Sequence, residues 1–317
     1  MNKEKQLNII SPLLIVLAAL IWGISFVAQS EGGEIGSFTF QSVRCTLAFI
    51  SVGIVTLITN NTGKAKLNKK KYNGIKDWAS QNKTFIKCGI ICGISLGIAN
   101  NLQQFGIEMQ GKETSTGRAA FLTALYIIIV PVFGIFFKKK IHLLSWCSVL
   151  VAIGGLYLIS VQPGSGLSIS TADILLILCA VFFGTQIFTV DYFNGQVDGL
   201  KLSCFQVFIA AIISYICMFM FEKPDINAIM GQAVPLIYSG VFSGGAAFTL
   251  QILGQKRCNP VLASLLMSLE SVFSALADWI IRGNTMNPRE LMGCGVMFIA
   301  ILLAQAPDFL KSRKNNV

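Results

Sequence analysis

The sequence predicts an all-α integral membrane protein whose ten transmembrane helices form two inverted five-helix repeats around a central cavity. The prediction rests on the composition, the length of the apolar segments and a repeated pair of motifs. Of the 317 residues, 54% are apolar and only 13% are charged, whereas charged residues make up about 25% of a typical soluble domain. A soluble core would leave much of this apolar surface in water, but a bilayer accepts it on every outward face.

Ten segments approach the length of about 20 mostly apolar residues that a helix needs to cross the hydrocarbon of a bilayer. They are predicted at 10–29, 38–59, 84–107, 114–137, 142–160, 171–191, 199–221, 232–254, 259–281 and 287–306. The first segment follows the basic residues Lys3 and Lys5, just as the apolar region of a signal peptide follows a basic region. Because more apolar segments follow and no clear cleavage site ends it, we expect a retained first helix.

The positions of the basic residues predict the orientation of the chain, because Lys and Arg are retained on the cytoplasmic side during insertion. With the N-terminus inside, most of the 25 Lys and Arg residues lie on the inner side, above all in the stretch 64–87. We therefore expect a multi-pass protein of the cell membrane with both termini in the cytoplasm. The net charge of +10 is then a topology signal. It implies contact with membrane lipid and requires no nucleic acid.

Two motifs of the first half of the chain recur in the second half. ALIWGISF at 19–26 is similar to AVFFGTQI at 180–187, and LYIIIVPVF at 125–133 is similar to LMSLESVF at 266–273. Each half of the chain, with one copy of both motifs, contains five predicted spans. Because five is an odd number, the second half must enter the membrane from the opposite side. Inverted repeats of this kind favour alternating access to a site near the midplane between the halves.

The repeat divides the chain into five parts. They are a cytoplasmic N-terminus at 1–10, a first repeat at 11–160, a linker at 161–170, a second repeat at 171–306 and a basic cytoplasmic tail at 307–317.

The chain resembles the EamA type of the drug/metabolite transporter superfamily over nearly its whole length. The resemblance rests on the span count, the duplication and the residues Trp22-Gly23, Val130-Pro131 and Glu270-Ser271. The resemblance implies that spans one to four and six to nine surround the cavity while five and ten lie at the periphery. It also implies transport of amino acids, other metabolites or drugs, often outward and often coupled to a proton or exchange gradient. Where the family commonly has Glu-Pro, this chain has Glu270-Ser271 in one half and Val130-Pro131 in the other.

Arg44 and Glu270 are the charged residues placed well inside predicted spans, where a charge costs at least about 2.5 kcal/mol. One hypothesis makes Arg44 a docking point for a substrate carboxylate and Glu270 a gate or a proton-coupling group. The alternatives are a buried structural ion pair, or an Arg44 side chain that extends to the membrane interface.

Amide side chains interrupt the third predicted span at Asn100, Asn101, Gln103 and Gln104. Asn100, Gln103 and Gln104 share a helix face, so they are candidates for the lining of a substrate path, with interhelical hydrogen bonding as the alternative. Gln186 and Gln251 add amides to the second half. Gly89, Gly93 and Gly97 precede this cluster at a spacing that lets another helix approach closely.

Trp22, Tyr126 and Phe183 are candidates for an aromatic wall of the cavity, with core packing as the alternative. The candidate substrate-binding residues are thus Trp22, Arg44, Asn100, Gln103, Gln104, Tyr126, Phe183, Gln186 and Glu270. The nine cysteines show no ligand or disulfide spacing, and we expect no metal, cofactor or disulfide.

These features favour a secondary active transporter that exports amino acids or related metabolites. The alternative is a permease for uptake or exchange of another polar metabolite, drug or organic cation. An intramembrane enzyme is not expected, since the sequence has no HExxH or DDxxD motif and its single histidine, His142, lies at the inner end of the fifth predicted span. A passive pore is usually an oligomer with rings of filter residues. A homodimer is compatible with the sequence, which does not determine the oligomeric state.

Overall fold

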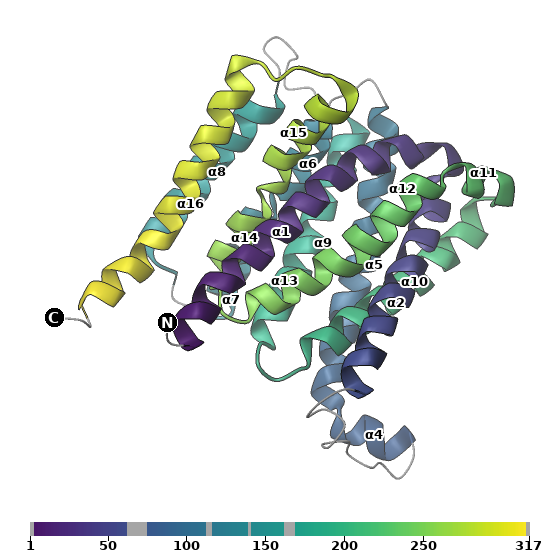
Figure 1. Cartoon of the computed structure of the whole chain (residues 1–317), viewed down its shortest axis with the longest axis horizontal. Helices are drawn as coiled ribbons and strands as arrows, with labels where there is room; N and C mark the ends of the chain where they lie inside the picture. The colour runs from purple at the N-terminus through teal and green to yellow at the C-terminus, as the bar shows by residue number, and fades with distance from the viewer. Residues whose placement is uncertain (1–2, 62–74, 112–115, 139–140, 162–168, 315–317) are drawn as a thin grey trace.

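A computed structural model describes residues 3–61, 75–111, 116–138, 141–161 and 169–314, and these residues form helices joined by short turns, without a β-strand (Figure 1). The first elements are α1 (Lys3–Glu31), η1 (Gly32–Ile35), α2 (Ser37–Asn61), α4 (Ile75–Gln81), α5 (Lys83–Gln110), α6 (Thr116–Ala124), α7 (Tyr126–Phe136) and α8 (Leu143–Ser160). Most of the linker expected over 161–170 lies outside the described residues, as does the lysine-rich part of the loop at 62–74.

The second part of the chain contains the remaining helices. They are α9 (Thr171–Tyr192), α10 (Gly199–Phe221), α11 (Ile226–Gly231), α12 (Ala233–Ile237), η2 (Tyr238–Ala247), α13 (Phe248–Gln255), α14 (Pro260–Met267), α15 (Glu270–Arg282) and α16 (Pro288–Lys314). The helix α1 begins and α16 ends at the same end of the bundle (Figure 1). We call this the termini end and the other the opposite end.

Eight helical segments among the described residues are long and apolar enough to cross a membrane. They are Ile10–Glu31, Ser37–Asn60, Lys83–Gln110, Thr116–Phe136, Thr171–Tyr192, Gly199–Phe221, Ala233–Gln255 and Pro260–Arg282. The chain is therefore a multi-pass membrane protein. The two other expected spans, 142–160 and 287–306, correspond to α8 and α16, which lie side by side at one edge of the bundle (Figure 1).

Helices from the two parts of the chain alternate around the bundle. The helix α1 packs against η2, α13 and α15, while α9 packs against α5, α6 and α7. The glycine in each copy of the first repeated motif lies close to a neighbouring helix. A Cβ atom on Gly23 would lie 2.4 Å from the Phe273 Cβ, and one on Gly184 would lie 2.6 Å from a methyl group of Ile129. A larger residue at either position would push two helices apart.

Two expected continuous helices are broken in the middle. The span expected at 114–137 is divided at Leu125, whose N–H bonds the Leu122 carbonyl at 3.3 Å. The span expected at 259–281 is divided at Ser268 and Leu269, and the Leu269 N–H bonds the Leu266 carbonyl at 3.3 Å. Such i to i+3 bonds tighten a helix end and change the direction of the next segment.

The span expected at 232–254 contains a π-helix, η2, between α12 and α13. Three glycines of η2 press against α2: Cβ atoms on Gly240, Gly244 and Gly245 would lie 2.5–2.9 Å from the side chains of Leu47, Ala48 and Ser51. Since π-helical turns are rare and occur mostly at functional sites, this segment points to the part of the bundle described next.

At the termini end, aromatic rings join α7 to α9. The rings of Phe137 and Phe188 have their centroids 4.9 Å apart, and Phe133 also contacts Phe188, at 5.9 Å. Aromatic pairs of this kind contribute about 0.5–1.5 kcal/mol beyond the area that they bury.

We expect Gly23→Val to lower the free energy of unfolding by about 1–3 kcal/mol, because the added atoms overlap the α15 backbone at Phe273. The measurement is thermal or denaturant unfolding in detergent. Gly154→Ala is the control, since nothing lies within 4 Å of a Cβ atom there. It should be neutral or stabilise by about 0.5–1 kcal/mol. Equal losses for the two variants would contradict the close packing of α1 on α15.

Candidate functional site

A cavity lies between the two parts of the chain, with about 30 Å³ open to the centres of water molecules. This is room for about two waters, so the cavity is small. Its walls come from α1, α2, α5, α6, α7, α9, α13, α14 and α15. The lining residues are Trp22, Phe26, Gln29, Arg44, Gln103, Thr123, Tyr126, Phe183, Gln186, Ile187, Phe248, Gln251, Met267 and Glu270.

The cavity brings together most of the residues that the sequence predicted. Trp22, Arg44, Gln103, Tyr126, Phe183, Gln186 and Glu270 line it, whereas Asn100 and Gln104 do not. Sequence reasoning missed Gln29, because a single glutamine near the end of a span gives no signal of its own.

Asn100 and Gln104 lie behind the cavity wall and bond other helices. The Gln104 Nε2 donates to the Gln29 carbonyl at 3.1 Å, and its Oε1 accepts from Gln41 at 3.4 Å. The Asn100 amide lies 4.0 Å from the Cys45 sulfur. Gln104 therefore holds α1 against α5, close to the point where Gln29 enters the site.

Arg44 is buried, and its hydrogen-bond acceptors are all neutral. The Nε donates to the Ser239 carbonyl at 3.1 Å and Nη2 to the Ser243 Oγ at 3.0 Å, both in η2. Nη1 donates to the Oε1 atoms of Gln29 and Gln41, each at 3.2 Å. No carboxylate of the described residues pairs with it, so neither the buried ion pair with Glu270 nor a side chain extended to the interface is found.

A guanidinium group carries five N–H donors, and the four bonds above use four of them. One N–H of Nη2 therefore has no hydrogen bond among those four, and the Arg44 side chain that carries it borders the cavity. Arg44 can therefore give a charge-assisted hydrogen bond to an anionic group without losing the bonds that hold it.

Glu270 and Tyr126 are the first residues after the two helix breaks, and their side chains meet. The Tyr126 hydroxyl donates to the Glu270 Oε1 at 3.0 Å, and Glu270 is 5% exposed. Because Glu270 opens α15, its carboxylate lies at the end of that helix that favours negative charge. No cation lies within ion-pair distance of it among the residues described, so this carboxyl group can accept a proton or an ammonium group.

Four glutamines form a chain of hydrogen bonds, and two of them, Gln186 and Gln251, line the cavity. Gln186 bonds Gln206 at 3.1 Å and Gln251 at 3.0 Å, and Gln251 also bonds Gln255 at 3.2 Å. Gln255 reaches the Ile187 carbonyl at 3.3 Å. The Gln251 Oε1 and the Gln206 Nε2 are buried without a partner. An unpaired buried polar atom is costly, which makes Gln251 a candidate for contact with a bound molecule.

The apolar part of the wall is mostly aromatic. The rings of Trp22 and Phe248 have their centroids 5.0 Å apart, and the Trp22 Nε1 donates to the Ser243 carbonyl of η2 at 3.2 Å. Phe26, Phe183 and Met267 extend this surface. The cavity thus joins an apolar wall to separate positive and negative groups.

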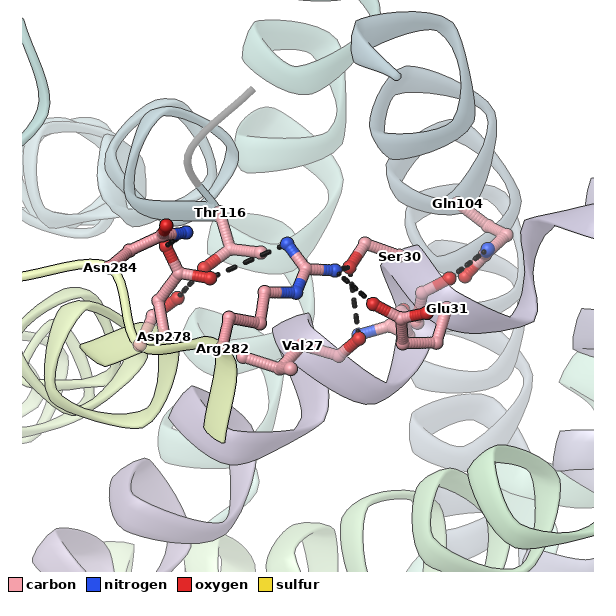
Figure 2. Close-up of polar contacts among 10 residues, drawn as sticks. Val27, Ser30, Glu31, Gln104, Thr116, Asp278, Arg282 and Asn284 are labelled. Carbon is pink, nitrogen blue, oxygen red and sulfur yellow. Dashed lines mark hydrogen bonds and ion pairs between the residues drawn. The ribbon is translucent and has the colours of Figure 1, made fainter. Parts of the chain in front are cut away.

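Ion pairs join the two parts of the chain at the opposite end. Figure 2 shows Arg282 between Asp278 on its own helix and the last residues of α1. Its Nη2 lies 2.7 Å from Glu31 and also bonds Ser30, while Nη1 lies 3.4 Å from Asp278. Asn284 donates to the other oxygen of Asp278 at 3.1 Å. α1 and α15 are held together by charge here.

A second ion pair joins α6 to α9. The Arg118 Nε and Nη2 donate to the two oxygens of Asp173 at 2.9 and 2.7 Å. Asp173 also accepts from the Ser170 backbone N–H at 2.8 Å as part of a capping box. This bidentate geometry is the strong form of an arginine–carboxylate contact.

The fold and site define a multi-pass membrane protein with a polar cavity enclosed by its helices. The sequence profile of the EamA-like transporter family matches residues 9–161 and again 170–305. The chain belongs to the EamA-like transporter family.

Individual relatives agree with this assignment. An uncharacterized transporter of Archaeoglobus fulgidus is 24% identical over 292 residues, which are 91% of this chain and 83% of that one. A second uncharacterized transporter, of Acidianus ambivalens, is 27% identical over 60% of this chain and 73% of its own length. A solved crystal structure superposes with a TM-score of 0.70 over 93% of this chain and 98% of that one. At 17% identity this last likeness shows the fold alone.

We expect Arg44→Lys to reduce the free energy of unfolding by about 1.5–3 kcal/mol for each hydrogen bond lost. An ammonium group has three donors where Arg44 makes four bonds, so at least one acceptor in this group loses its partner. Denaturant unfolding measures the loss. Arg257→Lys is the matched control, because Arg257 is exposed and should change stability by less than about 0.5 kcal/mol. If the two variants unfold alike, the neutral acceptors do not stabilise the guanidinium.

The two ion pairs at the opposite end should differ in strength. Asp173 is 3% exposed and Glu31 is 49% exposed. We expect Asp173→Asn to cost about 1.5–3 kcal/mol and Glu31→Gln less than about 1 kcal/mol, measured by unfolding of the purified protein. A larger loss from Glu31→Gln would contradict this order.

Proposed function

We propose that the protein is a secondary active transporter that exports a zwitterionic metabolite, an amino acid or a close relative, by alternating access. The observation that carries the proposal is the presence of Arg44 and Glu270 in one cavity, each without a partner of opposite charge among the described residues. Buried charges are expensive unless they are paired. A molecule with a carboxylate and an ammonium group would supply both missing partners.

The substrate's side chain should be apolar and large. Trp22, Phe26, Phe183, Phe248 and Met267 would surround it, and such walls provide most of the contact area in small-molecule sites. The glutamines Gln29, Gln103, Gln186 and Gln251 would fix its orientation through hydrogen bonds.

Two inverted repeats of five spans are the architecture we propose for this function, with α8 and α16 as the fifth and tenth spans. The family profile matches two consecutive stretches of similar length. The pairing of α1 with η2, α13 and α15 is mirrored by the pairing of α9 with α5, α6 and α7. Gly23 and Gly184 take equivalent close contacts in this scheme. Family membership also favours a transporter over an enzyme.

The substrate would leave through the opposite end of the bundle, which the sequence places outside the cell. Phe26 borders both the central cavity and a second, smaller one lined by Ser30, Gln110, Thr116 and others. The ion pairs of Arg282 and Arg118 lie at this end. In this state Phe26 and the ion pairs would close the exit.

Glu270 is the group that we propose for proton coupling. In an empty site its carboxyl group is stabilised by Tyr126 and, among the described residues, by no cation, so it would bind a proton when the substrate's ammonium group is absent. Exchange of proton for substrate at one carboxylate would couple their movements.

The first test is binding of an amino acid with a large apolar side chain, such as phenylalanine, to the purified protein. Removing one partner of a buried charge pair costs about 2–5 kcal/mol, which is a loss of about 30-fold or more in affinity. We therefore expect the N-acetyl derivative, which lacks the ammonium group, to bind at least that much more weakly. Isothermal titration calorimetry measures the affinities.

The Glu270→Gln variant makes the test specific. It should bind the amino acid more weakly but should discriminate much less against the N-acetyl derivative. Asp225→Asn serves as the control, because Asp225 is an exposed helix cap outside the cavity, and it should discriminate as wild type does. If Glu270→Gln kept the full discrimination, Glu270 would not contact the ammonium group.

Transport in proteoliposomes tests the coupling. We expect an imposed pH gradient to drive substrate movement by wild type but not by Glu270→Gln, since an amide does not bind a proton in this range. Exchange of labelled for unlabelled substrate without a gradient should persist in the variant. Full dependence of Glu270→Gln transport on the pH gradient would rule out coupling at this residue.

A further inference from the structure

A second, larger opening lies on the side of the bundle, between α2, η2 and α13. About 310 Å³ of it is open to the centres of water molecules, which is ten times the corresponding volume of the central cavity. Its walls are Ser51, Val52, Val55, Leu200, Val241, Gly245, Ala246, Thr249 and Leu250. None of these residues borders the central cavity.

The chemistry of this cleft differs from that of the cavity. Its hydroxyl groups already have partners: Ser51 donates to the Ala48 carbonyl at 2.9 Å, and Thr249 donates to the Gly245 carbonyl at 2.8 Å. The remaining walls are aliphatic or glycine. A polar molecule would find no free side-chain donor among these wall residues, whereas an apolar chain would lose nothing. For scale, an apolar cavity of roughly 150 Å³ in another protein binds benzene.

The cleft opens toward lipid. Val55 in its wall is 51% exposed, and its neighbours Ile54 and Ile58 on α2 are 53% and 59% exposed. Phe242 of η2, on the other side, is 49% exposed. Large apolar side chains exposed on spanning helices face acyl chains, so acyl chains surround the opening of the cleft.

Positive charge lies beside the cleft at the termini end. Leu200, a cleft residue, is followed by the exposed Lys201. The Lys256 Nζ lies 3.6 Å from where a Cβ atom of Gly199 would be, one residue before Leu200. Asp198 is occupied as the cap of α10, where it accepts from the backbone N–H groups of Leu200 and Lys201. Basic side chains at a membrane surface attract anionic lipid headgroups.

We propose that this cleft binds one acyl chain of an anionic phospholipid, with its headgroup at Lys201 and Lys256. The chain would act as a wedge between α2 and η2. Next to the cleft, α2 and η2 touch through Gly240 and Gly244. In the same stretch, η2 supplies the Ser239 and Ser243 acceptors of Arg44. Occupancy of the cleft would therefore change the position of η2 relative to Arg44 and make the substrate site sensitive to lipid.

Photoaffinity labelling of the full-length protein in vesicles tests the site. The probes are phosphatidylglycerol and phosphatidylcholine analogues with a photoreactive group on the acyl chain, used in phosphatidylcholine vesicles. We expect the phosphatidylglycerol probe to label residues 51–55 and 241–250 more strongly than the phosphatidylcholine probe does. Unlabelled phosphatidylglycerol should remove this excess. Equal labelling by the two probes, or labelling spread evenly over the lipid-facing helices, would overturn the proposal.

Two kinds of variant separate the acyl chain from the headgroup. Ala246→Phe fills the cleft and should lose the labelling, whereas Ile216→Phe, on an exposed part of α10, should keep it. Lys201→Gln with Lys256→Gln should remove the preference for phosphatidylglycerol, whereas Lys83→Gln should not. Unchanged labelling in Ala246→Phe would place the lipid elsewhere and overturn the proposal.

Trp22 reports on the wedge, because its indole N–H bonds the Ser243 carbonyl of η2. In a variant with Trp78, Trp146 and Trp279 changed to Phe, adding phosphatidylglycerol should shift the Trp22 emission. The shift should disappear when Ala246→Phe is added. A shift that survives Ala246→Phe would refute the link between cleft and η2. These readouts need no substrate, so their failure would leave the proposed function intact. Failure of the substrate-binding tests would likewise leave the lipid site intact.

Discussion

The constraint on which the centre of this structure depends is the solvation of one guanidinium group inside a bundle of apolar helices. Arg44 is 2% exposed, so the protein must provide most of its acceptors, and they come from three separate elements: α1, α2 and η2. Neutral acceptors stabilise the cation without cancelling its charge. Had a carboxylate been placed beside it, the pair would have no net charge and would attract an anionic ligand less strongly. The positions of Gln29 and of the π-helix follow from this requirement.

The helix breaks serve the same region in a different way. An unbroken helix would bury every backbone group in its own ladder and present only side chains, whereas a break exposes a new helix start at membrane depth. Tyr126 and Glu270 occupy these two starts and bond each other. Irregular backbone inside a membrane is tolerated where it borders a cavity rather than lipid. The Tyr126–Glu270 contact therefore joins the two broken helices where they border the cavity.

Eight of the ten predicted spans match helices long and apolar enough to cross a membrane, because the thickness of a bilayer fixes their length. The sequence pointed to Arg44 and Glu270 because charges at that depth are rare. It did not predict which face of a helix points inward. In α5, Gly89, Gly93 and Gly97 pack on α10, and Asn101 continues that line by bonding Ser214 at 2.8 Å. This packing sets the rotation of α5, so Gln103 enters the cavity while Asn100 and Gln104 stay behind it. The partners of Arg44 in η2 lie about 200 residues away in sequence, and the packing that unites them is not visible in any local pattern.

The two ends of the bundle are joined by different chemistry, and this gives them different thermal behaviour. Separating α7 from α9 at the termini end would expose the rings of Phe133, Phe137 and Phe188, and exposure of apolar surface to water raises the heat capacity. Separating α1 from α15 at the opposite end would expose the Arg282–Glu31 ion pair, and exposure of polar groups to water lowers the heat capacity. In the proposed alternating access, the balance between the two openings would therefore change with temperature.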